Sequence, residues 1–349
     1  AISYAAKLTH VDDAHKLTTG KGVKIAIVDT GAEKEHPDLK GQIRQSANFV
    51  DGGDLNFTRD KHGTAVAGVI GARANDGIGI YGIAPEAELL PLRACRPRAP
   101  EQIEGVCAAY ALGRAVDFAI VNGARVINLS VAGPRDALMP RLMARAHERG
   151  IVVVAAVGNL GPKAPAPYPA AIETVIAVTA VDARAAIYPA AVQGPFVSVA
   201  APGVEVVTTF PGGRWAVHTG TSMAAAHVSG VVALLVQARP ELSPAAVRGL
   251  LESTAQASGP GGRSLQLSFE LEAAGDHYVT LFDPVSFGSR AYRFAGVTKG
   301  DVAGSYRIPM RRAGIRLFGT VENLSDRRYF VQGFPTAGRT ARGGLAVAF

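Results

Sequence analysis

Short apolar runs alternate along residues 24–253 with longer stretches in which apolar residues recur at helical spacing. A short unbroken apolar run is typical of a buried strand, and a 3.6-residue period is typical of a helix packed on a core. Because strands joined by helical crossovers pair in parallel, the alternation predicts an α/β fold with a doubly wound, mostly parallel sheet flanked by helices. We expect strands at 24–29, 88–92, 124–129, 151–156 and 174–178, and helices at 62–71, 106–121, 137–149, 222–235 and 243–253.

The pattern changes beyond residue 257. The segment Ala257–Gly262 has the glycine-rich composition of a linker. From Leu265 to Glu272 apolar and polar residues alternate, and this period of two predicts a strand with one apolar face. Further strands are expected near 279–282, 302–308, 315–321 and 340–349. We therefore predict a domain of residues 1–257, a linker at 258–264 and a small antiparallel β segment at 265–349.

Composition supports a globular protein. Of the 349 residues, 48% are hydrophobic and 19% are charged, which excludes a largely disordered chain. There is no run of about 18 apolar residues, so we expect no transmembrane helix. No signal peptide precedes Ala1, so we expect a mature, trimmed or intracellular chain. The net charge of +7 comes from small scattered groups such as Arg141, Arg145 and Arg149, which favour a solvated helix face over a nucleic-acid partner.

The sequence contains two cysteines, Cys95 and Cys107, on either side of an arginine- and proline-rich loop. A disulfide that closes this loop would fit an oxidising compartment, whereas two free buried thiols would fit a reducing one. Both alternatives stay open at this point. Two cysteines alone cannot form a structural zinc site.

Two polar residues lie where chemistry is often found. Asp29 ends the apolar run 24–29, at the carboxyl edge of the predicted sheet, although an aspartate there is also a common turn cap. Ser222 opens the long apolar stretch that ends at Leu235, where unpaired backbone N–H groups and the helix dipole would stabilise an oxyanion. Serine before a helix is also an ordinary cap, so the residue alone does not decide between the two roles.

His62 and Asn159 also lie at the ends of predicted elements, one at the start of a helix and the other after a strand. His62 begins a helical stretch, where the dipole disfavours a positive charge and a neutral imidazole could act as a general base. Asn159 follows the predicted strand 151–156, and its amide could donate into a neighbouring site or merely suit the turn. The segment Gly77–Gly82 matches a dinucleotide-binding pattern but follows a helix rather than a strand, so we discount it.

These residues occur in the order Asp29, His62, Ser222. The surrounding motifs are Val28-Asp29-Thr30-Gly31, His36-Pro37-Asp38-Leu39, His62-Gly63-Thr64, Asn128-Leu129-Ser130, Gly158-Asn159 and Gly220-Thr221-Ser222-Met223-Ala224. With these motifs, the sequence from about Val23 to Ala257 resembles the subtilisin-like serine peptidases. The resemblance implies a subtilisin-like fold and a serine endopeptidase that acts on peptides or proteins.

The resemblance also implies a role for each of these residues. Ser222 corresponds to the nucleophile, His62 to the general base and then acid, and Asp29 to the group that orients the imidazole. Asn159 corresponds to the oxyanion donor, assisted by the backbone N–H of Ser222. The chemistry implied requires no cofactor, and a propeptide that is removed on maturation is a further expectation.

The substrate pocket is implied by two further segments. One wall aligns with Ser130, Val131, Ala132 and Gly133, and the other aligns with Ala156, Val157 and Gly158. Neither segment carries a charged residue, and Leu160 follows Asn159. We therefore expect a large apolar or aromatic residue before the cleaved bond.

A structural calcium site is implied at Asp38 together with Asn75 and Asp76 in the loop 74–80. These residues supply the hard oxygen ligands that calcium prefers. An ordinary Asn-Asp-Gly turn is the competing interpretation of the loop.

The segment Leu265–Phe349 resembles the last strands of TonB-dependent outer-membrane receptors. The carrying residues are Val321-Glu322-Asn323-Leu324, Asp326 to Phe330, Gly338-Arg339-Thr340 and Phe349. Four or five strands cannot close a membrane barrel, which disfavours membrane association of a monomer. A soluble appendage, a barrel built from several chains and a poorly folded remnant stay open.

This second resemblance implies a Gram-negative bacterium and a secreted, periplasmic or outer-membrane-associated protein. It also defines an alternative function, a binding or surface-attachment module in which the β segment is the functional part.

Overall fold

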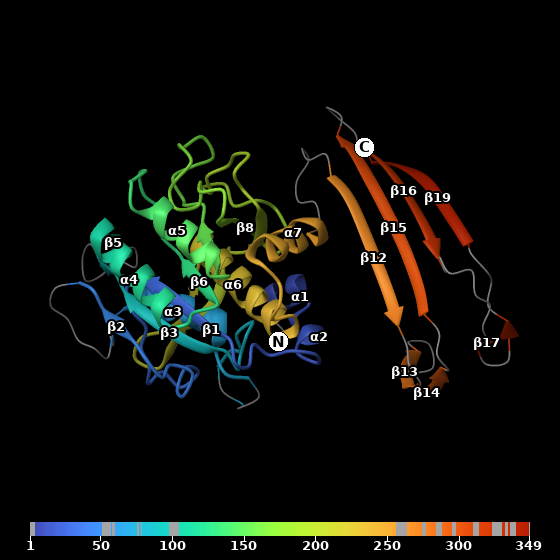
Figure 1. The fold of residues 1–349 in the computed structure, drawn as a ribbon, viewed down its shortest axis with the longest axis horizontal. Coiled ribbons are helices and arrows are strands. Elements are labelled where there is room, and N and C mark those ends of the chain that lie inside the picture. Colours follow the sequence, from blue (N-terminus) through green and yellow to red (C-terminus); the bar gives the residue numbers. More distant parts are fainter. Residues whose placement is uncertain are drawn as a thin grey trace. The chain divides into compact units, whose positions relative to one another are not determined.

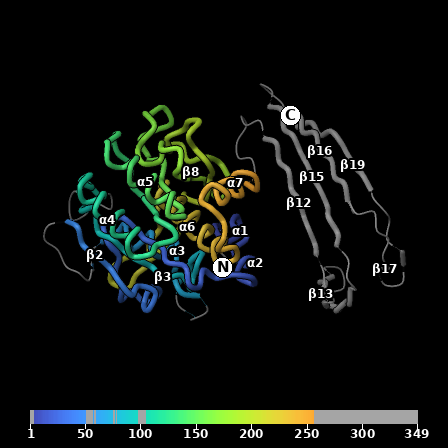
Figure 2. Tube along the Cα trace, viewed as in Figure 1, coloured from blue at the N-terminus to red at the C-terminus, as the bar shows by residue number. Residues whose placement is uncertain are grey.

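The computed structural model describes residues 4–50, 57, 60–74, 77, 79–97 and 105–255 with their side chains, and beyond them the backbone of the strands between 264 and 348. The chain divides into two units, Ala1–Ser258 and Gly259–Phe349. Figure 2 follows the backbone of the first unit from blue near the N-terminus to orange at residues 244–254. The predicted linker at 258–264 lies outside the described residues except for Ser264.

A seven-stranded parallel sheet is the centre of the first unit (Figure 1). Its strand order, β2-β3-β1-β6-β7-β8-β9, places β1 next to β3 and β6. The strands are β1 (Lys24–Asp29), β2 (Ala47–Asn48), β3 (Glu88–Arg93), β6 (Val126–Leu129), β7 (Val152–Ala156), β8 (Ile176–Val181) and β9 (Val199–Pro202). The predicted fold class is thereby confirmed, and the carboxyl ends of β1, β6 and β7 lie along one edge of the sheet.

Helices cover both faces of this sheet. In β1, Ile25 and Ile27 pack with α3 and α6 in one hydrophobic core, whereas Ala26 and Val28 pack with α4 and α5 in a second core on the other face. This alternation is the period of two that a strand imposes on its side chains. The helices of the unit are α1 (Tyr4–Thr9), α2 (Val11–Ala14), α3 (Lys61–Gly71), α4 (Ala109–Val121), α5 (Met139–Glu148), α6 (Thr221–Ala238) and α7 (Pro244–Thr254).

The helix α6 is apolar around most of its circumference because it is buried against the sheet and α3. Among the described residues it is the one helix long and apolar enough to cross a membrane, although no such helix was expected from the sequence. Of its 18-residue apolar window, 72% is buried inside the unit. Its hydrophobicity is therefore accounted for by the protein core.

Two hairpins depart from the sequence expectation. The helix expected at 106–121 begins at Ala109, because Gly105–Cys107 forms strand β5 and pairs with β4 (Cys95–Pro97). The hairpin of β10 (Val206–Phe210) and β11 (Arg214–His218) was not predicted. In β11 the residues are largely exposed and do not alternate between apolar and polar, so the strand carries no periodic signal.

The second unit contains an antiparallel sheet in the order β12-β15-β16-β19 and two separate hairpins, β13-β14 and β17-β18. Its strands are β12 (Ser264–Ala273), β13 (His277–Asp283), β14 (Gly288–Phe294), β15 (Thr298–Pro309), β16 (Gly314–Glu322), β17 (Phe330–Val331), β18 (Phe334–Pro335) and β19 (Thr340–Ala348). The antiparallel pairing agrees with the alternating pattern of the sequence, and β14, β17 and β18 are additional to the strands expected. The family to which the segment belongs stays a prediction.

Candidate active site

The carboxyl end of β1 carries Asp29, whose side chain is 2% exposed. One of its oxygens, Oδ1, accepts a hydrogen bond of 2.7 Å from the backbone N–H of Thr30. The hydroxyl of Thr30 in turn accepts a bond of 3.1 Å from the backbone N–H of Gly63 on α3. The end of the strand and the beginning of α3 are thus held together.

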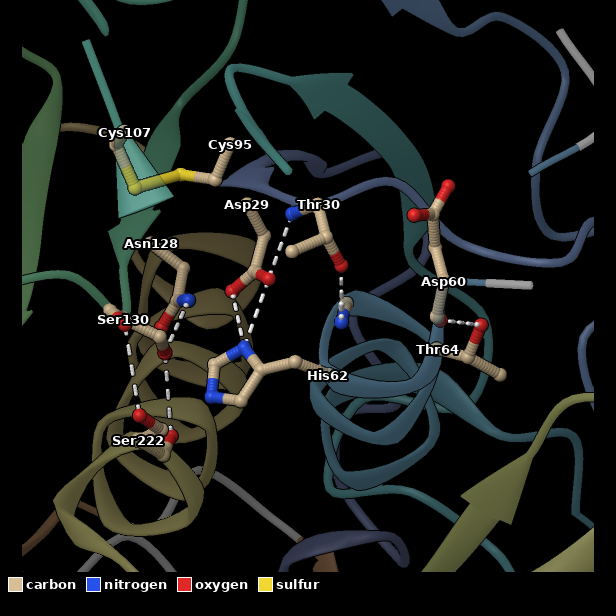
Figure 3. A network of polar contacts seen from close by, with 11 residues as sticks. Asp29, Thr30, Asp60, His62, Thr64, Cys95, Cys107, Asn128, Ser130 and Ser222 are labelled. Atoms are coloured by element: carbon tan, nitrogen blue, oxygen red, sulfur yellow. Dashed lines mark hydrogen bonds and ion pairs between the residues drawn. A yellow bond between two sulfur atoms is a disulfide. The ribbon is translucent and has the colours of Figure 1, made fainter. Parts of the chain in front are cut away.

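His62 is the second residue of α3. Its Nδ1 lies 2.7 Å from Oδ1 and 2.9 Å from Oδ2 of Asp29. Because an ionised carboxylate accepts hydrogen bonds and cannot donate them, Nδ1 carries the proton when the imidazole is neutral, and the lone pair is on Nε2. Figure 3 shows the ring between Asp29 and Ser222, with its second nitrogen on the side of Ser222. With 15% of its side chain exposed, His62 is largely shielded from water.

Ser222 is the second residue of α6 and is bonded to Ser130, which follows β6 (Figure 3). The hydroxyl of Ser222 donates to the carbonyl of Ser130 over 3.5 Å, and the hydroxyl of Ser130 donates to the carbonyl of Ser222 over 3.3 Å. At 3.5 Å the bond from Ser222 is weak, so its hydroxyl is readily released to another acceptor.

A buried polar residue extends this support. Asn128 is fully buried in β6, donates to the hydroxyl of Ser130 over 2.9 Å and accepts from the hydroxyl of Ser229 on α6 over 2.9 Å. Since buried polar groups are costly unless they are paired, this network fixes α6 against the sheet. One signal for this network is present in the sequence, an asparagine inside the apolar run Val126–Leu129.

Asn159 lies beside the first turn of α6. Its Oδ1 accepts hydrogen bonds of 3.1 Å from both the backbone N–H and the hydroxyl of Thr221. The hydroxyl of Thr221 also accepts a bond of 3.1 Å from the backbone N–H of Gly158. Because Oδ1 is occupied in this way, the orientation of the amide is fixed and Nδ2 is the end that can donate to a ligand.

Comparison with known proteins identifies the family of this chain. Residues 20–270 match the model of the subtilase family, a match that spans well over half of the chain. The chain belongs to the subtilase family. It is 37% identical over 262 residues to a thermophilic serine proteinase of Bacillus sp. (strain AK1), covering 74% of this chain and 63% of that protein. It is also 37% identical to thermitase of Thermoactinomyces vulgaris, covering 74% of this chain and 90% of thermitase.

The crystal structure of a cold adapted subtilisin-like serine proteinase is similar to this subtilase, with a TM-score of 0.61 and 27% sequence identity. The similarity covers 68% of this chain and 83% of the solved chain. Residues 271–349 lie outside the family match.

The two segments expected to line the substrate pocket of this subtilase approach each other closely. A Cβ on Gly158 would lie 3.2 Å from the Cβ of Ala132, so the glycine leaves just enough room between the segments. Gly133 exchanges two backbone hydrogen bonds of 2.9 Å with Tyr168. The side chains of Ala156 and Val157 are buried in the core, so of these two residues the backbone alone is available to a ligand.

The subtilase has a disulfide between Cys95 and Cys107, which joins β4 to β5 beside the site (Figure 3). The hairpin packs on the residue after Asp29: a Cβ on Gly105 would lie 3.0 Å from Cγ2 of Thr30 and 3.2 Å from the Cβ of Cys95. Of the two cysteine states left open by the sequence, the structure contains the oxidised one. Disulfides of this kind belong to oxidising compartments.

Asp38 is fully buried and is the described member of the predicted calcium site. Its Oδ2 accepts hydrogen bonds from Nε1 of Trp215 over 2.7 Å and from the backbone N–H of Ile80 over 3.0 Å, whereas Oδ1 is buried without a hydrogen-bond partner. An unpartnered buried carboxylate oxygen fits a hard cation. Asn75 and Asp76 lie outside the described residues. Among the residues that the structure describes, no group of three or more His, Cys, Asp or Glu side chains could hold a metal.

Two buried histidines of the subtilase have a lowered pKa. His227, on α6, is fully buried, its Nδ1 bonds to the carbonyl of Met223 over 2.8 Å, and burial lowers its pKa to about 4. His218, at the end of β11, has its pKa lowered by burial and, to a smaller extent, by the neighbouring His62. Both are therefore neutral at neutral pH.

Proposed function

We propose that this subtilase is a serine endopeptidase in which Ser222 is the nucleophile, His62 the general base and Asp29 the residue that orients His62. The observation that supports it most strongly is the pair of contacts from His62 Nδ1 to the Asp29 carboxylate, at 2.7 and 2.9 Å, with the ring turned toward Ser222. Such an arrangement leaves Nδ1 protonated and turns the basic Nε2 toward the serine hydroxyl, whose proton it can take (Figure 3).

The reaction then follows in two stages. As Ser222 Oγ attacks the carbonyl carbon of the peptide bond, its proton moves to Nε2 of His62, and Asp29 stabilises the imidazolium that results. The imidazolium returns this proton to the leaving amine, and an acyl group remains on Ser222. Water, activated by the same histidine, then releases the acid. The chemistry uses groups of the chain itself and water, and it requires no cofactor.

The negative charge of the tetrahedral intermediate needs hydrogen-bond donors. Asn159 meets this requirement because Thr221 holds its Oδ1 and leaves Nδ2 as the donor. The backbone N–H of Ser222, in the first turn of α6, is the second donor of the proposal, because helix geometry gives it no intrahelical partner. Donors fixed before the reaction stabilise the oxyanion without reorganisation.

We further propose a preference for a large apolar or aromatic residue before the cleaved bond. The pocket segments Ser130–Gly133 and Ala156–Gly158 bring no charge to the site. A set of peptide p-nitroanilides that differ in this residue tests the preference. Higher kcat/KM for Phe and Leu than for Lys and Arg agrees with the proposal, and the reverse order contradicts it.

Hydrolysis of internal bonds tests the activity itself. Wild type should cut a denatured protein at internal sites, and Ser222→Ala should not. A wild type that binds such substrates without hydrolysing them would instead support the alternative of a binding or surface-attachment module. The present geometry favours the enzyme, because a carrier needs neither the Asp29–His62 pair nor the oriented Asn159 amide.

A structural calcium ion at Asp38 is part of the proposal. Asp38 Oδ1 would contact it, with Asn75 and Asp76 as the further ligands indicated by the sequence. When bound, the ion would neutralise the buried carboxylate and so stabilise the fold.

For localisation we propose a secreted protein that matures by loss of a propeptide. The disulfide between Cys95 and Cys107 supports export to an oxidising compartment. A periplasmic or outer-membrane location in a Gram-negative bacterium depends on the resemblance of residues 265–349 and stays a prediction. Extraction of the native protein by salt or only by detergent separates a soluble β appendage from a membrane-associated one.

A further inference from the structure

Asp38 has a buried carboxylate, and the described residues donate hydrogen bonds to one of its two oxygens. Oδ2 has two donors, Trp215 Nε1 and the Ile80 N–H, but Oδ1 has none. A carboxylate that is removed from water with one bare oxygen is strongly disfavoured unless a cation pairs with it. The arrangement around Asp38 is therefore most stable when a cation contacts Oδ1.

The hydrogen bond between Trp215 and Asp38 is covered by backbone. A Cβ on Gly79 would lie 2.3 Å from Asp38 Oδ2 and 2.4 Å from Trp215 Nε1, so the chain passes directly over both atoms. Gly79 has φ +53°, a conformation that glycine adopts readily. This close approach shields the bond from water on the side of Gly79, while 38% of Trp215 stays exposed.

The tip of the β10–β11 hairpin rests on the segment that contains Asp38. His36 Nε2 donates to the carbonyl of Arg214 over 2.8 Å, and the His36 ring meets the Trp215 ring edge-on at 5.5 Å. The backbone N–H of Gly212 donates to Glu33 over 2.8 Å. The hairpin is therefore docked by several contacts, of which the Trp215 bond is the one shared with the carboxylate.

The same hairpin contacts the helix of His62 and leads into the helix of Ser222. The hydroxyls of Thr208 and Thr209 donate to the carbonyls of Ala65 and Thr64 on α3, over 2.6 and 2.7 Å. Strand β11 ends at His218, and α6 begins three positions later, at Thr221. Movement of the hairpin would therefore disturb both helices that carry the proposed catalytic pair.

We propose that Trp215 makes the β10–β11 hairpin the sensor of a cation bound to Asp38, and that the hairpin transmits its occupancy to the helices of His62 and Ser222. The docked hairpin holds Oδ2 through Trp215 and so fixes the carboxylate whose other oxygen, Oδ1, would bind the cation. A cation on Oδ1 therefore stabilises the docked state. By linkage, any change that undocks the hairpin weakens cation binding by the same factor. The inference rests on the calcium site and the catalytic serine of the proposed function.

Terbium luminescence tests the sensor, because Tb³⁺ takes the oxygen ligands of Ca²⁺ and Trp215 is the sole tryptophan of the sequence. Excitation of Trp215 should sensitise emission from Tb³⁺ bound to the wild type, and Asp38→Asn should abolish it. Removal of the cation with EDTA should increase acrylamide quenching of Trp215, since the hairpin undocks. For Trp215→Phe, the binding of Tb³⁺ is measured by direct excitation of the ion. Its affinity should be about tenfold lower than in wild type, which is the order expected for the loss of one charge-assisted hydrogen bond.

Val217→Ala is the matched control, because Val217 lies on the same strand, is 61% exposed and leaves Trp215 in place. Wild type and this control should react with a fluorophosphonate faster in calcium than in EDTA. Trp215→Phe should react with the fluorophosphonate equally slowly in calcium and in EDTA.

The inference is overturned if Tb³⁺ binds the wild type without sensitised emission, or if Trp215→Phe binds Tb³⁺ as tightly as wild type. A wild type that binds no Tb³⁺ removes the calcium site and the inference together. In that case fluorophosphonate labelling of Ser222 still decides the peptidase function independently.

Discussion

Replacement of Asp29 by asparagine removes the negative charge from the site while it preserves the size of the side chain. The carboxylate lies 2.7 Å from His62 Nδ1, and both side chains are largely buried. With an effective dielectric constant of ~20, Coulomb's law gives about 6 kcal/mol between unit charges at that distance. The neutral amide keeps part of this attraction as a hydrogen bond, so we expect a loss of about 4–5 kcal/mol, or 10³–10⁴ in kcat/KM.

The orientation of the new amide adds to this loss. Thr30 donates to Oδ1, so the oxygen of the asparagine should remain there and its NH₂ group should face His62. An NH₂ group favours a histidine that accepts on Nδ1 and carries its proton on Nε2, which cannot act as a base.

The assay is kcat/KM on a peptide p-nitroanilide with Phe before the cleaved bond, with circular dichroism and thermal unfolding to show that the variant is folded. Asp117→Asn is the matched control, because its side chain is 47% exposed and lies on α4, and it should stay within twofold of wild type. A folded Asp29→Asn enzyme within tenfold of wild type would refute the proposed role of Asp29.

Three other predictions concern the oxyanion, the disulfide and pH. Asn159→Ala should lower kcat and leave KM nearly unchanged. The corresponding donor in subtilisin contributes about 10²–10³ to kcat, and that figure is taken from subtilisin rather than worked out for this chain. A kcat equal to that of wild type would exclude the assignment. Joint replacement of Cys95 and Cys107 by serine should lower the free energy of unfolding in urea by about 3 kcal/mol, because the unfolded chain gains loop entropy over a separation of 12 residues, and an unchanged midpoint would contradict this. Since burial lowers the pKa of His227 to about 4, the unfolded chain binds this proton below about pH 6.5 and the folded chain does not. The contribution of neutral His227 to the free energy of unfolding should be complete above pH 6.5 and be lost as pH falls toward 4. In urea titrations over this range, the free energy of unfolding of His227→Gln should fall less steeply with pH than that of wild type. An equal slope would show that other groups dominate.

The sheet could be predicted from the sequence because its strands are short apolar runs buried on both faces. In Lys24–Asp29 and Val152–Ala156 nearly every side chain is buried, so the pattern is unbroken and the strand is evident. The positions of Asp29 and Asn159 follow from the same pattern, since both residues come where a run ends.

The β10–β11 hairpin could not be predicted in this way. Its second strand is held by backbone pairing and by contacts of single side chains, such as Trp215 with Asp38. These contacts join residues 177 positions apart in the sequence, and local periodicity contains no information about them. For the same reason the hydrogen bond from Ser229 to Asn128 has no local signal beyond a polar residue in an apolar run.

The predicted helix at 106–121 illustrates a third case. Apolar residues continue from Val106 into α4, and the period alone cannot show that Gly105–Cys107 pairs with Cys95–Pro97 first. The pairing places Cys95 opposite Cys107, so the long-range disulfide overrides the local helical pattern.

In the proposed mechanism one hydroxyl, on Ser222, is activated by His62 and Asp29. The most direct measurement is reaction of the native protein with a fluorophosphonate followed by mass spectrometry of its peptides. We expect a single adduct, on Ser222, that is absent from Ser222→Ala and forms much more slowly in Asp29→Asn. A folded wild type that forms no adduct, or an adduct on any other residue, would contradict it.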